Sequence, residues 1–168
     1  MTLTMHTATV PTCAGALNSL AGILEKAARH AQARKIDPKV LLNTRLFPDM
    51  LPLATQLQIA NDIAQSGAAR LAGAPVPVFE AKERSLEEWI AATRGTVNYL
   101  ESLPPAQFAG AEDRTITWPS RSSVKSMQGT AYLFHHVLPN VFFHVTTAYD
   151  ILRQAGLDIG KQDYLARV

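Results

Sequence analysis

Apolar residues recur every three or four positions in four separate segments, and this spacing restricts the fold more than any other feature of the chain. Such spacing places the apolar side chains on one face of an α-helix, where they can form a shared core. We therefore predict four amphipathic helices. They span residues 10–35, 49–71, 85–103 and 129–154.

Residues that start and stop helices mark the ends of several of these segments. Ser85 followed by Glu88 predicts a capping box, in which each side chain accepts a bond from the other residue's backbone N–H. Gly156 stands where a left-handed residue would end the last helix. Asp49 precedes Pro52 by three residues and is the expected N-cap of the second helix, with the proline in its first turn.

The segment between the third and fourth helices follows a different pattern. Residues 114–118 alternate between polar and apolar side chains, and residues 124–127 can pair with them across a turn. We expect a short two-stranded excursion or an extended loop here. The sequence therefore predicts an all-α fold, a four-helix bundle with one irregular or two-stranded insertion before the last helix.

Length, composition and charge narrow the class of protein. The 168 residues match the usual size of one domain, so we expect a single domain over residues 1–168, and 47% hydrophobic residues suffice for a core. Scattered basic residues and a net charge of +2 predict no nucleic-acid partner.

Apolar runs and the single cysteine add two further expectations. No apolar run approaches the roughly 20 residues that a membrane helix needs, and the N-terminus lacks the pattern of a signal peptide. We therefore expect no membrane partner and a cytoplasmic location. Cys13 is the only cysteine and is expected to be a buried structural thiol.

Polar residues interrupt the apolar face of the last helix. Helical spacing places Asn140 and His144 on the same face as Val137 and Ala148, and His136 lies one turn before Asn140. A buried polar group without a partner costs about 1–3 kcal/mol, so these side chains need partners.

The second helix supplies such partners if it packs against the fourth. Asp49 and Gln56 are seven residues apart and are expected to share one helix face. Our leading hypothesis is a polar pocket between helices two and four that binds a small molecule or is a degenerate metal site. Its candidate residues are Asp49, Gln56, His136, Asn140 and His144.

An ordinary structural role is open to each of these residues as well. Asp49 can be the N-cap of its helix, and Gln56 can bond a neighbouring backbone group. Asn140 can satisfy the carbonyl that loses its donor because Pro139 has no N–H. His144 can be a core histidine that bonds a carboxylate or an amide.

The spacing of the histidines does not supply a standard metal site. A transition-metal site usually has three protein ligands from His, Cys, Asp or Glu. His136 and His144 lie about 12 Å apart along the helix axis, too far to share an ion, and Asn140 occupies the position between them. His144 and Asp49 are at most a partial ligand set for a divalent metal, so the sequence names no cofactor.

The last helix also resembles that of the DinB-like (YfiT-like) four-helix-bundle superfamily. Members commonly have an HxxxH pair in this helix, then Leu-Arg, then Gly; His144, residues 152–153 and Gly156 fall at these positions. The resemblance covers nearly the whole chain and points to a bacterial branch described as a domain of unknown function. That branch is matched by residues 48–53, Gln56, 138–140 and 160–165.

The resemblance implies a four-helix bundle that is often a homodimer. In the wider superfamily one histidine of helix two and two of helix four bind a divalent metal, and some members are thiol-dependent transferases. Only His144 matches a ligand position, because Asn140 replaces the other histidine and helix two offers Asp49 or Gln56. A metal-dependent hydrolase or thiol transferase, and a dimeric structural or interaction module, are therefore the alternatives to a small-molecule pocket.

Overall fold

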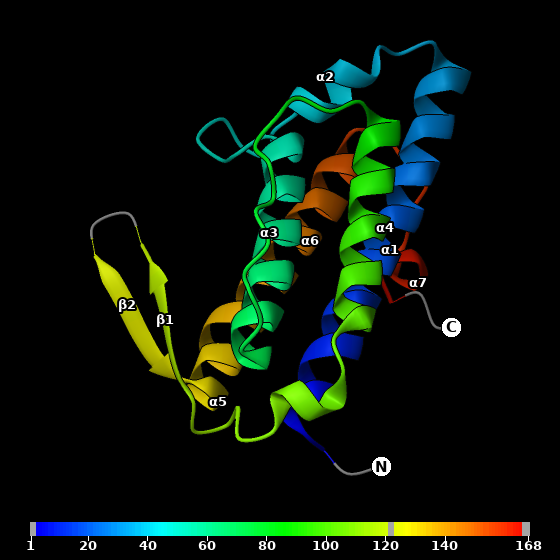
Figure 1. The fold of residues 1–168 in the computed structure, drawn as a ribbon. Helices are drawn as coiled ribbons and strands as arrows, with labels where there is room; N and C mark the ends of the chain where they lie inside the picture. The colour runs from blue at the N-terminus through cyan, green and yellow to red at the C-terminus, as the bar shows by residue number, and fades with distance from the viewer. Residues whose placement is uncertain (1–2, 121–122, 166–168) are drawn as a thin grey trace.

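Four long helices form the predicted bundle in the computed structural model, which describes residues 3–120 and 123–165 (Figure 1). Helix α1 packs mainly against α4 and α6, whereas α3 packs mainly against α6 and α4. The helices adjacent in sequence are thus not always the closest neighbours. The four are α1 (Met5–Arg34), α3 (Leu53–Ala72), α4 (Leu86–Ser102) and α6 (Leu138–Gln154).

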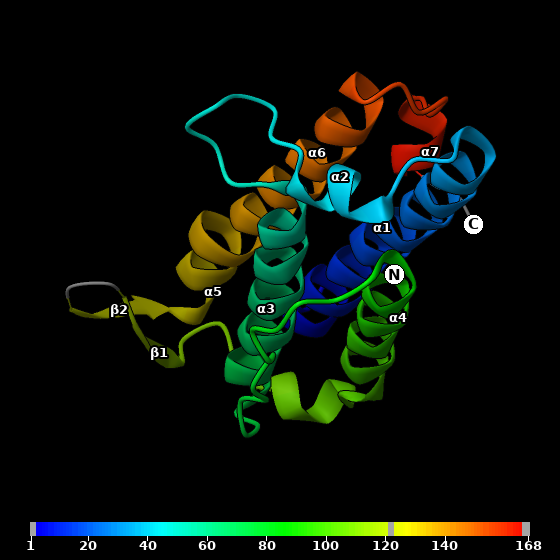
Figure 2. The same ribbon diagram turned by 90° about the horizontal axis from the view of Figure 1, so that it is seen from above.

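A β-hairpin projects beside the bundle, as Figures 1 and 2 both show. Strands β1 (Thr115–Pro119) and β2 (Val124–Gln128) pair antiparallel, with Thr117 opposite Ser126. The prediction of a two-stranded excursion is therefore confirmed. The remaining short elements are α2 (Pro38–Asn43), η1 (Pro105–Phe108), α5 (Gly129–Tyr132), the π-helical segment η2 (Leu133–Val137) and α7 (Lys161–Leu165).

Two helix starts differ from the sequence prediction. Helix α1 begins at Met5 rather than near residue 10, because Thr4 and Thr7 form a capping box ahead of it. Helix α3 begins at Leu53, and Asp49 is not its N-cap. The residue before a proline is disfavoured in the helical region, so Pro52 keeps the preceding residues out of the helix. The capping box of Ser85 and Glu88 at α4 is confirmed.

The last predicted helix is continuous in direction but not in its hydrogen bonding. Within η2 the Leu138 N–H donates to the Leu133 carbonyl, five residues back, instead of four. Pro139 follows at once and has no N–H to offer. A wider turn next to a proline is a common way for a helix to accommodate the missing donor. Gly156, with φ of 92°, ends this helix region as predicted.

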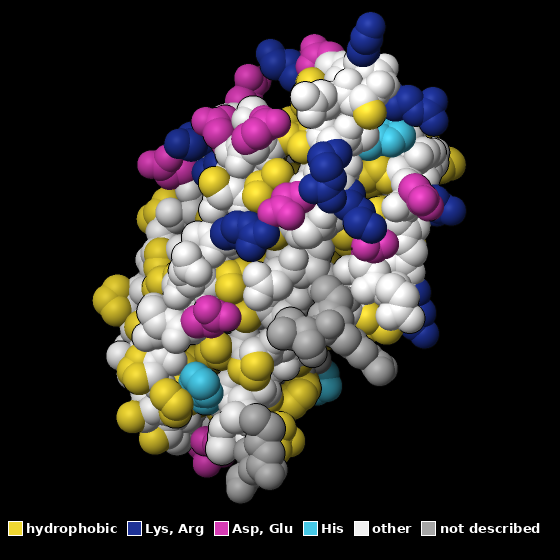
Figure 3. Space-filling view, turned by 90° about the vertical axis from the view of Figure 1, so that its right-hand side faces the viewer, with side chains coloured by type: hydrophobic (Ala, Val, Ile, Leu, Met, Phe, Trp, Pro, Cys, Tyr) yellow, Lys and Arg dark blue, Asp and Glu magenta, His cyan; other side chains and the backbone are white. Residues whose placement is uncertain are grey.

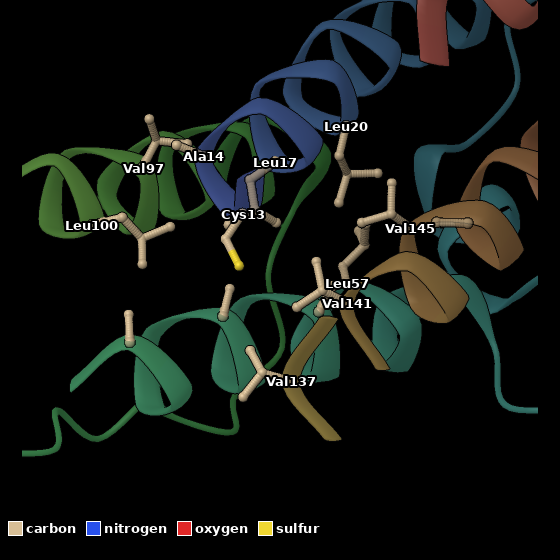
Figure 4. Packing of buried hydrophobic residues seen from close by; sticks show 14 of the residues in the cluster. Cys13, Ala14, Leu17, Leu20, Leu57, Val97, Leu100, Val137, Val141 and Val145 are labelled. Carbon is tan, nitrogen blue, oxygen red and sulfur yellow. The ribbon is translucent and has the colours of Figure 1, made fainter. Parts of the chain in front are cut away.

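The core lies between α1, α3, α4 and α6, and Figure 4 shows its centre. Leu17 and Leu20 of α1 meet Leu57 of α3 and Val145 of α6 there. Cys13 is fully buried among these residues, and burial raises the pKa of its thiol to about 12. The thiol is therefore protonated at neutral pH, and the expected burial of Cys13 is confirmed.

Charges of both signs are interspersed on the face of the molecule shown in Figure 3. Arg94 pairs with Glu25 at 2.5 Å, and Lys26 pairs with Asp163 at 2.6 Å, so α4 and α7 are each linked to α1. This face carries no stripe of a single charge. In the part of the chain that the structure describes, no helix is long and apolar enough to cross a membrane.

Gly67 of α3 lies in close contact with Val137 of η2. A Cβ atom added to Gly67 would lie 2.7 Å from a methyl group of Val137, which is fully buried. A Cβ added to Gly95, on the exposed side of α4, would meet nothing within 4 Å. These two helical glycines differ in packing, so one can serve as the control for the other.

We predict that Gly67→Ala lowers the free energy of unfolding relative to Gly95→Ala. Overpacking costs about 1–3 kcal/mol, whereas alanine in an open helix position gains about 0.5–1 kcal/mol over glycine. Urea denaturation of both variants and the wild type measures the difference. Equal stabilisation by both substitutions would show that α3 and η2 are not closely packed at Gly67.

Candidate functional site

A buried hydrogen bond joins the two predicted site residues of α3 and α6. The Nδ1 atom of His144 lies 2.6 Å from Oε1 of Gln56, and the side chains are only 8% and 1% exposed. Gln56 Nε2 donates to the Leu51 carbonyl at 3.0 Å, which turns the amide oxygen of Gln56 towards His144. Since that oxygen can only accept, His144 Nδ1 must carry the proton and donate it.

The state of the imidazole follows from this geometry. Burial lowers the pKa of His144, so the ring is neutral at neutral pH. With Nδ1 protonated, Nε2 carries a lone pair. No described residue bonds Nε2, and this nitrogen is not one of the fully buried side-chain atoms that lack a partner. Such a nitrogen can accept a hydrogen bond, take up a proton or bind a metal.

Phe143 forms the apolar border of this site. Its ring meets the His144 ring edge-on, with the centroids 5.2 Å apart and the planes at 90°. The Phe143 side chain is also 56% exposed, which is high for a phenylalanine. Sequence reasoning did not single out Phe143, although its place next to His144 in the chain was a usable signal.

Asn140 bonds a backbone carbonyl, as its structural alternative proposed, but not the carbonyl that the alternative named. Its amide Nδ2 donates to the His136 carbonyl at 2.6 Å. The carbonyl expected to lose its donor to Pro139 is that of His135, one residue earlier. The π-helical turn of η2 lies directly before this hydrogen bond. Asn140 is half-buried one turn before His144, and no hydrogen bond joins the two side chains in the described residues.

His136 belongs to a different cluster, at the base of the hairpin. Its ring stacks on Trp118 with centroids 4.7 Å apart and lies 5.2 Å from the ring of Tyr132. Burial lowers the pKa of His136, and the positive charges of Lys125 and Arg70 lower it further. Its neutral ring therefore helps to hold the hairpin against the bundle.

Asp49 is exposed in the loop before α3, and the predicted helix face shared with Gln56 is wrong. Within the described ranges its carboxylate makes no hydrogen bond and no ion pair. The structure thus joins Gln56 and His144 and keeps Asn140 nearby on the same helix. Among the described residues, no hydrogen bond joins the side chain of Asp49 or of His136 to Gln56 or His144. The Leu51 carbonyl, a backbone group, completes the arrangement instead.

Comparison with known proteins assigns the family. The family model described as a domain of unknown function (DUF1993) matches residues 5–165. The chain belongs to the DUF1993 family. The crystal structure of a DinB family member protein from Shewanella denitrificans is similar, at 38% identity and a TM-score of 0.86, and the match covers 97% of this chain and 92% of that chain. No curated protein matches this sequence. The expected DinB-like four-helix bundle is confirmed.

The metal site of the wider superfamily does not fit this DUF1993 chain. Within the described residues, no group of three His, Cys, Asp or Glu side chains could hold an ion. Around His144 the polar groups are the amides of Gln56 and Asn140 and the Leu51 carbonyl. Neutral amides are not the ligands of standard zinc sites, so His144 alone does not make a metal centre.

We predict that His144 makes the stability of this DUF1993 protein depend on pH. Because burial lowers its pKa in the folded state, the unfolded chain binds more protons once the pH falls below about 6.5. The stability that neutral His144 contributes is therefore present above this pH and is lost as the pH falls. Urea denaturation at pH 7.5 and pH 5 should show a smaller difference for His144→Gln than for the wild type.

His135→Gln is the matched control for this measurement, because His135 is exposed on the same helical region. It should retain the pH dependence of the wild type. If both variants reduce the pH dependence equally, His144 is not distinguished by its burial. The control also separates the effect of His144 from that of His136, which neither substitution removes.

Proposed function

We propose that this protein binds a small molecule at a site between α3 and α6 that is centred on Nε2 of His144. One observation carries the proposal. Gln56 holds the buried, neutral imidazole of His144 through Nδ1, and no described residue bonds its Nε2. An acceptor that is fixed before the ligand arrives costs little conformational entropy on binding.

The surroundings of His144 indicate the chemistry of the ligand. A lone pair on Nε2 requires a hydroxyl or N–H donor. The partly exposed Phe143 ring offers an apolar edge beside it. A ligand with a hydroxyl or N–H group on an apolar ring meets both requirements.

The same features give less support to a metal-dependent hydrolase or transferase. His144 does share one feature with many metal ligands, because its Nδ1 donates to an oxygen, the amide Oε1 of Gln56, and this leaves Nε2 as the nitrogen that could bind an ion. Its neighbours Gln56 and Asn140, however, do not complete a standard ligand set. A metal site would need further ligands besides His144, whereas a hydrogen bond from a small molecule to Nε2 needs none.

The proposal predicts that phenol binds at His144 more tightly than toluene does. Both have an apolar ring, but only phenol can donate a hydrogen bond to Nε2. NMR titration should show phenol shifting the Hε1 resonance of His144, with an affinity several-fold to about tenfold above that of toluene, the usual contribution of one hydrogen bond.

Two variants test whether the preference arises at this site. His144→Phe keeps an aromatic ring but removes the acceptor, so the preference for phenol should disappear. Gln56→Leu leaves the imidazole without its orienting partner and should reduce the preference. Equal binding of phenol and toluene by the wild type, or an unchanged preference in His144→Phe, would refute the proposal.

A further inference from the structure

A cavity of about 490 Å³ opens between α2, the start of α3 and the loop that precedes α4. Figure 1 shows this loop running along α3 towards α4, with α2 near its end. The volume lies in the range of roughly 300–1,000 Å³ that is typical of ligand sites. The cavity borders a different face of α3 from Gln56, and its lining includes Lys39, Leu42, Gln58, Lys82, Arg84 and Trp89.

Arg84 is a half-buried cation in this cavity wall whose charge no carboxylate neutralises in the described residues. Its guanidinium lies 4.8 Å from the ring centre of Trp89 and 4.9 Å from that of Phe79. The aromatic contacts fix the plane of the guanidinium. Its hydrogen-bond acceptors are all neutral: Gln58 Oε1 at 3.3 Å and the carbonyls of Glu80 at 2.9 Å and Lys82 at 3.4 Å.

The hydrogen bonds of Arg84 leave donors for a ligand. A guanidinium has five N–H donors, and the three bonds of Arg84 use three of them. A positioned guanidinium with free donors is well suited to a carboxylate, because charge-assisted hydrogen bonds are stronger than neutral ones.

The cavity wall carries more positive than negative charge. Lys39, Lys82 and Arg84 line it together with a single acid, Glu83. Lys82 lies 3.5 Å from Glu80, but both side chains are more than half exposed, so this pair neutralises little charge. The excess of positive charge favours an anionic ligand.

Trp89 also contributes to the wall of the cavity. The indole N–H of Trp89 is buried and has no acceptor among the described residues, which is uncommon for a side chain that is only 2% exposed. Trp89 lines the cavity together with Leu42 and Ala54, so the wall also has an apolar part. A ligand for this wall needs an apolar body in addition to its charge.

We propose that this cavity binds a small carboxylate with an apolar body. The carboxylate interacts with Arg84 and with the neighbouring lysines, and the apolar body lies against Trp89 and Leu42. The inference is independent of the site at His144, since it uses other residues on another face of α3.

Titration with sodium octanoate tests this inference, with octan-1-ol as the uncharged control of equal chain length. Chemical-shift mapping should show octanoate moving the indole N–H signal of Trp89 and the backbone amide signal of Lys82. Octan-1-ol should bind at least about tenfold more weakly, because it offers no charge to Arg84. Equal binding of the two compounds, or shifts confined to residues outside the cavity wall, would overturn the inference.

Arg84→Gln should weaken octanoate binding about tenfold, the usual scale for a charge-assisted hydrogen bond. Lys125→Gln, on the hairpin, removes the same charge away from the cavity and should leave binding unchanged. If Arg84→Gln does not fold, Lys39→Gln takes its place and should also weaken binding. Equal effects of the cavity variant and Lys125→Gln would overturn the inference by showing that only net charge matters.

Discussion

The hydrogen bond between His144 and Gln56 fixes how α6 lies on α3. Both side chains are buried in an otherwise apolar interface, so a shift of α6 by one turn would leave two polar groups without partners. Each unpaired group would cost about 1–3 kcal/mol. The close contact of Gly67 in α3 with Val137, the last residue of η2 before α6, restricts the alignment in a second, steric way.

The same hydrogen bond also orients the imidazole of His144, which makes it the centre of the candidate site. The Leu51 carbonyl orients Gln56, Gln56 orients His144, and burial keeps the imidazole neutral. The described hydrogen bond of the ring is therefore on the Nδ1 side, and Nε2 has no partner among the described residues.

Sequence patterns predicted the parts of the fold that depend on local interactions. Helical spacing, the capping box at Ser85 and the alternation around Trp118 act over a few residues, and all three are confirmed. The pairing of Gln56 with His144 was also foreseen, since helix register alone places both on inward faces. The expected homodimer and cytoplasmic location stay predictions.

The features that the sequence did not predict depend on backbone details and on contacts between distant segments. Asp49 was placed on α3 because the N-cap pattern was given more weight than the restriction imposed by Pro52. The place of His136 depends on Trp118 of the hairpin, whose packing no local pattern reveals. The cavity near Arg84 was missed for a similar reason, because the loop before α4 has no periodicity.

The central claim is that Gln56 holds His144 as a neutral ring with the proton on Nδ1 and a free lone pair on Nε2. Long-range ¹H–¹⁵N correlation spectra of histidine-labelled protein at pH 7.5 test it most directly, because they report the protonation of each ring nitrogen. We predict a protonated Nδ1 and an unprotonated Nε2 for His144. A proton on Nε2, or on both nitrogens, would contradict the account.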